Sequence, residues 1–286
     1  MLINIFQKGF NFSQDGPGNR LVYHLQGCNM HCPWCSNPEG ISPKGSIMIY
    51  EDVSDDVCPK NAIIEGEFDS KICYGCSKMC LDHSHVGLKL SSESVETDDV
   101  VDEVLRSKSM FFSNGGVTFT GGEPTLNLPS LLDMLKKLKV QNINTAIETN
   151  GSHPELASIL PYVDHLIFDF KHYDDEKHRK TLGISNATIR RNLKKCSFLT
   201  NINIRIPLIK GFNTKEENAY GFVEELSHCN KENITVEFLK FHEYGKSKWT
   251  QCGMEYKMTG QEYVGQETLD MFIEIFNKNG IRTITT

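Results

Sequence analysis

Three cysteines lie close together near the N-terminus, in the stretch GCNMHCPWC at residues 27–35. Their spacing, C-x3-C-x2-C, follows a strand-like run and lets the thiolates of Cys28, Cys32 and Cys35 converge on one metal site. Soft thiolates favour zinc or iron–sulfur centres. No fourth cysteine lies nearby, so one metal position would stay open for a small molecule, as in catalytic zinc sites. The spacing favours an iron–sulfur cluster, with zinc or buried free thiols as the alternative.

A second group of cysteines lies between residues 38 and 96. Cys58 precedes a proline, and Cys73, Cys76 and Cys80 follow with the spacing C-x2-C-x3-C. The Cys-Pro pair resembles the end of a bacterial ferredoxin motif. Four thiolates could hold one four-iron cluster or one zinc, and we expect a second four-iron cluster here. The remaining cysteines are scattered, and we interpret them as packing residues: Cys196, Cys229 and Cys252.

Polar residues stand in or directly after several strand-like runs. Ligands of parallel α/β folds bind at the carboxyl ends of the strands, so these residues could line one site. Glycines let a ligand approach the backbone, and a carboxylate can pair with an ammonium group. Each residue alone could equally belong to a turn or a structural contact, but the set predicts a binding site. It comprises Gly121, Gly122, Glu123, Glu148, Asp169, Lys171, Arg205 and His242.

Strand-like and helix-like segments alternate from about residue 97 onward, which indicates an α/β fold with parallel strands and right-handed crossovers. With an early strand at 21–25, about six or seven strands result, enough for an open or closed barrel. We expect the barrel to start in residues 1–37, a small metal-stapled insert to occupy 38–96, and the rest of the barrel to follow in 97–286. The predicted strands are 116–120, 144–148, 165–170, 203–208, 234–240 and 281–284, and the predicted helices include 128–138, 216–226 and 267–277.

Charge and hydropathy exclude some classes of partner. The formal net charge is −7, and no run of Lys or Arg is long enough to follow a phosphate backbone, so we expect no nucleic acid partner. No stretch approaches the length of a membrane span. The first residues are too short and mixed for a signal peptide. We therefore expect a cytoplasmic protein without a membrane partner.

The first cysteine motif, C-x3-C-x-(aromatic)-C, resembles the signature of radical S-adenosylmethionine (radical SAM) enzymes. The resemblance implies a partial (β/α)6-type barrel, here with a ferredoxin-like insert. It also implies a four-iron cluster on Cys28, Cys32 and Cys35, whose fourth iron binds S-adenosylmethionine. Reductive cleavage of that cofactor gives a 5′-deoxyadenosyl radical. Trp34 would lie at the cluster, and the residues matching the family's Gly-Gly-Glu motif would bind the methionyl amino group: Gly121, Gly122 and Glu123.

Further motifs resemble one subfamily, the glycyl radical enzyme activating enzymes, typified by pyruvate formate-lyase activase. These motifs are DGPGNR at residues 15–20 and FHEYGKSK at residues 241–248. By this resemblance Lys171 contacts the carboxylate of the cofactor, and Arg205 and His242 match its conserved arginine and histidine. Glu148 stands where the subfamily usually has aspartate, in a position that would share a monovalent cation with Asp169.

The resemblance implies an enzyme that abstracts hydrogen from a glycine of a partner enzyme, of the pyruvate formate-lyase type. Flavodoxin or ferredoxin would supply the electron, and the partner would contact residues 15–20 and the insert. Two alternatives remain. The chain could modify a peptide or small molecule directly by the same radical chemistry, or it could be a zinc-stabilised or ferredoxin-like electron-transfer protein.

Overall fold

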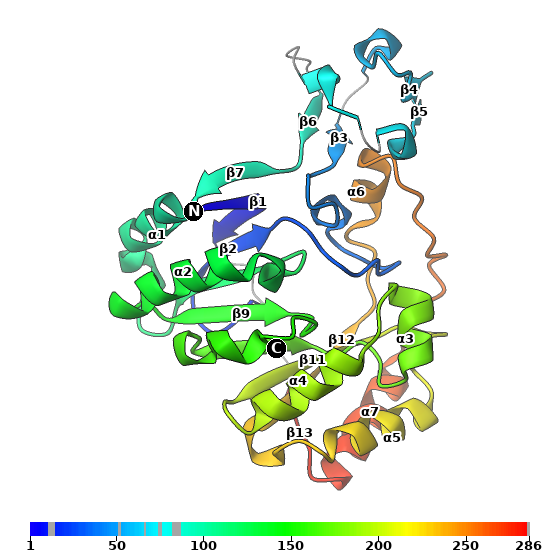
Figure 1. Cartoon of the computed structure of the whole chain (residues 1–286). Helices are drawn as coiled ribbons and strands as arrows, with labels where there is room; N and C mark the ends of the chain where they lie inside the picture. The colour runs from blue at the N-terminus through cyan, green and yellow to red at the C-terminus, as the bar shows by residue number, and fades with distance from the viewer. Residues whose placement is uncertain (11–14, 51–52, 66, 74–75, 82–86, 285–286) are drawn as a thin grey trace.

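A nine-stranded sheet forms the frame of the protein, in the order β13-β12-β11-β10-β9-β8-β2-β1-β7 (Figure 1). The computed structural model describes residues 1–10, 15–50, 53–65, 67–73, 76–81 and 87–284. The strands of this sheet are β1 (Leu2–Phe10), β2 (Arg20–Leu25), β7 (Glu93–Glu96), β8 (Gly116–Gly121), β9 (Thr145–Thr149), β10 (His165–Asp169), β11 (Ile202–Leu208), β12 (Ile234–Lys240) and β13 (Arg282–Ile284).

Strands β2 and β8 to β13 pair in parallel, as their alternation with helices predicts. The side chains of Val117 and Phe119 belong to the hydrophobic core beneath the helices, which cover the outer face of the curved sheet (Figure 1). This arrangement confirms the predicted partial barrel. The helices are α1 (Thr97–Arg106), α2 (Leu128–Val140), α3 (Asp175–Leu182), α4 (Ala187–Ser197), α5 (Glu216–Leu226), α6 (Lys246–Gln251) and α7 (Gln266–Lys278).

The inner face of the sheet carries charge. Alternation along β11 turns Ile204 and Ile206 to the core and leaves Arg205 on the opposite face, where its register partner on β12 is Glu237. Closed barrels of this type normally fill their interior with branched apolar side chains. Arg205 is 3% exposed and Glu237 is 2% exposed, so these charges have to be satisfied by partners inside the protein.

An antiparallel pair extends the sheet at its N-terminal edge, and the sequence analysis did not predict it. Strand β1 runs antiparallel to β2 on one side and to β7 on the other. The register between β1 and β2 shifts at a bulge between Ile5 and Gln7, which interrupts the alternation that a strand prediction relies on. Strand β7 lies inside the predicted insert, yet it belongs to the main sheet. The division at residues 38 and 96 stays a prediction.

The rest of the insert extends from one side of the sheet, as Figure 1 shows at the top of the view. It contains two short antiparallel pairs, β3 (Ile47–Ile49) with β6 (Leu88–Leu90) and β4 (Ile63–Ile64) with β5 (Glu67–Phe68). Its buried apolar cluster is small, and Cys58 is one of its members. So small a core contributes little stability, which agrees with the prediction that a metal bound to its cysteines stabilises the insert.

None of the described helices has the length and apolar character needed to cross a membrane.

Replacing Phe119 with alanine should lower the free energy of unfolding by about 3–5 kcal/mol, because it removes a fully buried ring. The ring stacks on Tyr23 of the neighbouring strand at 5.8 Å between centroids. The same substitution at Phe112, which is 80% exposed, should change the free energy by about 0.5 kcal/mol or less. Denaturant titration of both variants measures the difference, and equal losses would contradict the assignment of the core.

Candidate active site

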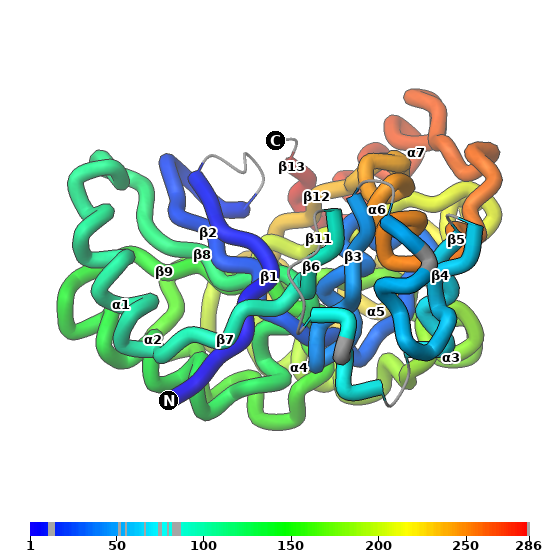
Figure 2. Tube along the Cα trace, turned by 90° about the horizontal axis from the view of Figure 1, so that it is seen from above, coloured from blue at the N-terminus to red at the C-terminus, as the bar shows by residue number. Residues whose placement is uncertain are grey.

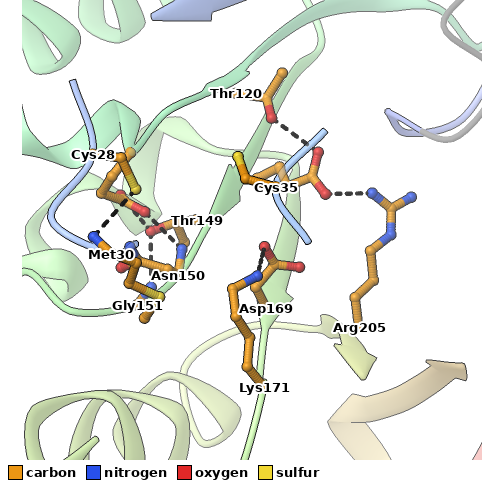
Figure 3. Close-up of polar contacts among 12 residues, drawn as sticks. Cys28, Met30, Cys35, Thr120, Thr149, Asn150, Gly151, Asp169, Lys171 and Arg205 are labelled. Carbon is orange, nitrogen blue, oxygen red and sulfur yellow. Dashed lines mark hydrogen bonds and ion pairs between the residues drawn. The ribbon is translucent and has the colours of Figure 1, made fainter. Parts of the chain in front are cut away.

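A cavity of about 370 Å³ opens at the carboxyl ends of the parallel strands. Most of the residues that the sequence predicted for the site line it, although they come from five strands and the first cysteine loop. Figure 3 shows several of them around one space. The predicted residues that line the cavity are Cys28, Cys32, Trp34, Cys35, Gly121, Gly122, Glu148, Asp169, Lys171, Arg205 and His242.

Backbone hydrogen bonds fix the start of the first cysteine loop. The N–H of Gly27 donates to the carbonyl of Gly40 at 2.8 Å, and the N–H of Cys28 donates to that of Ile41 at 2.9 Å. Gly27 has a φ of 102°, a left-handed conformation that favours glycine. The loop therefore leaves β2 through a sharp turn and is held against the segment that follows it.

The three thiols of this loop line the cavity. Burial raises the pKa of Cys28, Cys32 and Cys35 to about 12, and neighbouring thiols add to the rise. Three thiols that line one cavity and act on one another electrostatically fit a shared metal–thiolate centre, such as a four-iron cluster.

Gly121 and Gly122 have no room for a side chain. A Cβ on Gly121 would lie 2.4 Å from the backbone nitrogen of Leu25, and one on Gly122 would lie 2.1 Å from the carbonyl oxygen of Gly27. Gly121 therefore lets the end of β8 pack against β2, and Gly122 lets it pack against the start of the cysteine loop. They also line the cavity, where their backbone is open to a ligand.

Glu123 ties two strand ends together. Its carboxylate accepts hydrogen bonds from the Thr149 hydroxyl and the Asn150 backbone N–H, both at 2.7 Å, and from the Thr125 backbone N–H at 3.0 Å. The side chain is 1% exposed, and burial raises the pKa of its carboxyl. These contacts fix the β8 end to the β9 end. Binding of the methionyl amino group by Glu123 stays a prediction.

Lys171 brings a positive charge to the thiols. Its ammonium lies 2.9 Å from the Asp169 carboxylate at the end of β10. Burial alone would lower the pKa of Lys171, but Asp169 and the Cys32 thiol outweigh it and raise that pKa. Lys171 therefore stays charged and can attract an anionic group into the cavity.

An ion-pair network crosses the barrel interior. Arg205 Nη1 lies 2.6 Å from Glu148, and its Nε lies 3.0 Å from Glu237. Although burial opposes the charged forms, this pairing raises the pKa of Arg205 and lowers that of Glu148. Thr120 donates a hydrogen bond to Glu148 at 2.9 Å (Figure 3). Glu148 and Asp169, the predicted cation ligands, thus each face a cationic side chain of this chain.

Two contributors to this site were not predicted as such. Asp15 begins the DGPGNR motif, which the sequence analysis assigned to partner contact, yet it lines the cavity. Burial and the neighbouring Glu148 raise the pKa of Asp15 to about 8. The other contributor is Glu237. The only signal for it in the sequence is a carboxylate within a largely apolar strand, and its role becomes visible only through its ion pair with Arg205.

Aromatic side chains line the outer part of the cavity. The ring of Trp34 lies 5.1 Å from that of Phe212, and His242 stacks on Tyr244 at 4.2 Å. Burial lowers the pKa of His242, which favours its neutral imidazole. Tyr244 is 83% exposed although it lines the cavity. A flat ligand could stack on these rings.

The cysteines of the second group lie close enough together for their thiols to act on one another electrostatically. Burial raises the pKa of Cys73 to about 11, and Cys58, Cys80 and Cys76 each add to the rise. The ammonium of Lys78 acts in the opposite direction. Four thiols with an adjacent cation fit an anionic metal–thiolate group.

Comparisons with known proteins agree with this geometry. The sequence model of the Radical SAM superfamily matches residues 22–223. The 4-hydroxyphenylacetate decarboxylase activating enzyme of Clostridioides difficile (strain 630) is 34% identical, covering 93% of this chain and 90% of the relative. The (2S)-3-sulfopropanediol dehydratase activating enzyme of Klebsiella oxytoca is 30% identical, covering 94% and 92%. A radical SAM methyltransferase from Sphaerobacter thermophilus shares the fold, with a TM-score of 0.55 and 14% identity over 97% of this chain and 68% of that chain.

The chain belongs to the radical SAM superfamily and, within it, to the glycyl radical enzyme activating enzymes. This confirms the family that the cysteine spacing and the strand-end motifs indicate.

Replacing Arg205 with methionine should destabilise the protein by about 3–5 kcal/mol at pH 7, because it takes the cation from two buried carboxylates. The loss should shrink toward acid pH. Arg205 lowers the pKa of Glu148, so its stabilisation is present above the ordinary pKa of about 4.3 and is lost as the pH falls through the lowered value.

Denaturant titrations at pH 3 and pH 7 measure this effect, because pH 3 lies below the ordinary pKa of a glutamate and pH 7 lies above it. Arg179→Met is the matched control, because its pair with Asp175 is exposed and should contribute about 1 kcal/mol or less. A loss at Arg205 no larger than that at Arg179 would contradict the buried network.

Proposed function

We propose that this protein activates a glycyl radical enzyme. The support is the single cavity in which three buried thiols, a charged lysine and the open Gly-Gly backbone meet. When bound, a four-iron cluster and S-adenosylmethionine supply an organic radical that removes a hydrogen atom from the partner's glycine. In this proposal Cys28, Cys32 and Cys35 hold the cluster and leave one iron open.

The chain's own residues then bind and orient the cofactor. Lys171 attracts its carboxylate, the backbone at Gly121 and Gly122 contacts its methionyl end, and Trp34 and His242 provide aromatic surface. The barrel wall shields the reacting atoms from water, and no acid or base of the protein is needed for hydrogen abstraction. Arg205 keeps Glu148 in place at the cavity wall, so we infer a positioning role for this pair.

The identity of the partner follows only in part from the relatives. The names of the two relatives described above refer to 4-hydroxyphenylacetate decarboxylase and (2S)-3-sulfopropanediol dehydratase. The motifs suggest the pyruvate formate-lyase type, and these names widen the range of glycyl radical enzymes to be tested. We also infer that flavodoxin or ferredoxin donates the electron in the cytoplasm.

For the insert we propose a second four-iron cluster on Cys58, Cys73, Cys76 and Cys80. We also propose a monovalent cation at Glu148 and Asp169. Arg205 lies 2.6 Å from Glu148 but is shared with Glu237, and Lys171 lies 2.9 Å from Asp169, so these three carboxylates face only these two cationic side chains among the described ion pairs.

Anaerobic mixing with S-adenosylmethionine, reduced flavodoxin and the correct partner should release 5′-deoxyadenosine and give a glycyl radical doublet in the EPR spectrum. A triple Cys28/Cys32/Cys35→Ala variant should give neither, whereas Cys196→Ala, a buried thiol outside both groups, should give both. Release of 5′-deoxyadenosine without a doublet on any glycyl radical enzyme would contradict the proposal and favour direct modification of a peptide or small molecule.

Metal analysis of the anaerobically purified protein should give about eight irons and eight sulfides per chain, four for each cluster. Substituting alanine for the three cysteines of the first loop should remove about four of each. The same loss is expected when Cys73, Cys76 and Cys80 are replaced. About one zinc in place of either set would contradict the corresponding cluster.

A further inference from the structure

Helix α6 lies between the first cysteine loop and the insert. Both views place it beside β3 and near β4 and β5 (Figures 1 and 2), and it contacts β3 and the turn at Pro38–Gly40. It has only six residues and ends near Cys252, which is fully buried. Because a six-residue helix has little stability of its own, the position of α6 depends on the segments that it contacts at each end.

At one end, α6 holds the first cysteine loop. The indole N–H of Trp249 donates a hydrogen bond to the carbonyl oxygen of Cys35 at 2.9 Å. Gly245, which precedes the helix, packs so closely that a Cβ there would lie 2.6 Å from the Cα of Ser36. The backbone at Cys35 is therefore fixed by contacts from residues more than 200 positions later in the chain.

An ion pair adds a second anchor. The ammonium of Lys248 lies 2.6 Å from the Glu39 carboxylate and donates a hydrogen bond to Asn37 Oδ1 at 2.8 Å. The Glu39 side chain is 6% exposed and that of Lys248 is 29% exposed, so water screens the pair only in part. Residues 37–41 in turn accept the hydrogen bonds from Gly27 and Cys28.

At its other end, α6 meets the insert. The carbonyl of Gly253 accepts hydrogen bonds from the Ser70 hydroxyl at 2.8 Å and from its backbone N–H at 3.3 Å. Gly253 has a φ of 62°, and a Cβ there would lie 2.5 Å from Cδ1 of Phe68. Ser70 begins the turn that ends at Cys73, one of the four thiols of the second group.

We propose that α6 couples the two cysteine sites, with Trp249 and Lys248 as positioning residues for the first loop and Gly253 as the point where the insert acts on them. Ordering of the insert by a ligand at its four thiols then stabilises the conformation of the Cys28–Cys35 loop. By thermodynamic linkage, ligation of the first loop stabilises the insert to the same extent. This coupling does not depend on which substrate the enzyme uses.

The substitution Gly253→Ala tests the coupling, and the chain offers a matched control. Gly280 also has a left-handed φ, 73°, but a Cβ there would meet nothing within 4 Å. Both alanines suffer the same backbone strain, and only the one at 253 pushes against Phe68 of the insert. Ser70→Ala provides a milder second variant, because it removes one hydrogen bond and adds no bulk.

The measurement is hydrogen exchange of residues 28–41, followed by mass spectrometry on the full chain with and without iron and sulfide. Gly253→Ala and Trp249→Phe should speed exchange of this peptide, by about fivefold for one lost hydrogen bond. Gly280→Ala should leave it unchanged. In the anaerobic reconstituted protein, Gly253→Ala should also shift the EPR signal and midpoint potential of the first cluster.

Two outcomes would overturn the proposal. Faster exchange confined to residues 53–81 in Gly253→Ala, with residues 28–41 as in the wild type, would mean that the insert moves independently. Equal changes in the 253 and 280 variants would mean that the effect comes from lost stability alone.

Discussion

Charges buried within the barrel have to be neutralised there. The inner face of the sheet carries Arg205 in the middle of β11, between Glu148 and Glu237, and Lys171 lies beside Asp169 at the end of β10. Isolated charges in such surroundings are strongly disfavoured, so each strand must keep its register for its neighbour's charge to be met. The same balance that stabilises the sheet leaves a lysine ammonium next to three thiols, where an anionic group can bind.

The sequence predicted the parallel strands because short strand-like runs, such as the one rich in β-branched and aromatic residues at 116–120, alternate with helical segments along the chain. It also predicted the cavity residues, since polar groups that end such strands must meet at one edge. It could not predict that Glu123 bonds to Thr149 and Asn150, or that Asp15 reaches Glu148, because these contacts depend on distances between segments. Strand β1 escaped prediction because its bulge breaks the alternation.

Local spacing identified both groups of cysteines but gave no indication of how they are supported. The carbonyl of Cys35 is held by Trp249, 214 residues away, and the turn before Cys73 is held by Gly253. A short helix thus connects two loops that have little regular structure of their own. The three scattered cysteines also differ from one another. Cys196 and Cys229 pack in the main core. Burial raises the pKa of Cys252 to about 12, and the nearby Glu39 carboxylate and Cys35 thiol add to the rise.

The path of the chain into and out of the insert has an evolutionary consequence. The insert leaves the sheet after β2 and returns through β7, and both strands flank β1, so its two ends are anchored in the same part of the frame. Lengthening a loop whose ends are fixed is entropically cheap, about 0.6 kcal/mol for each doubling. A chain of this fold can therefore accept a different module between β2 and β7 without altering the parallel strands. To keep the contact with α6, the new module has to offer a hydrogen-bond donor to the carbonyl of Gly253.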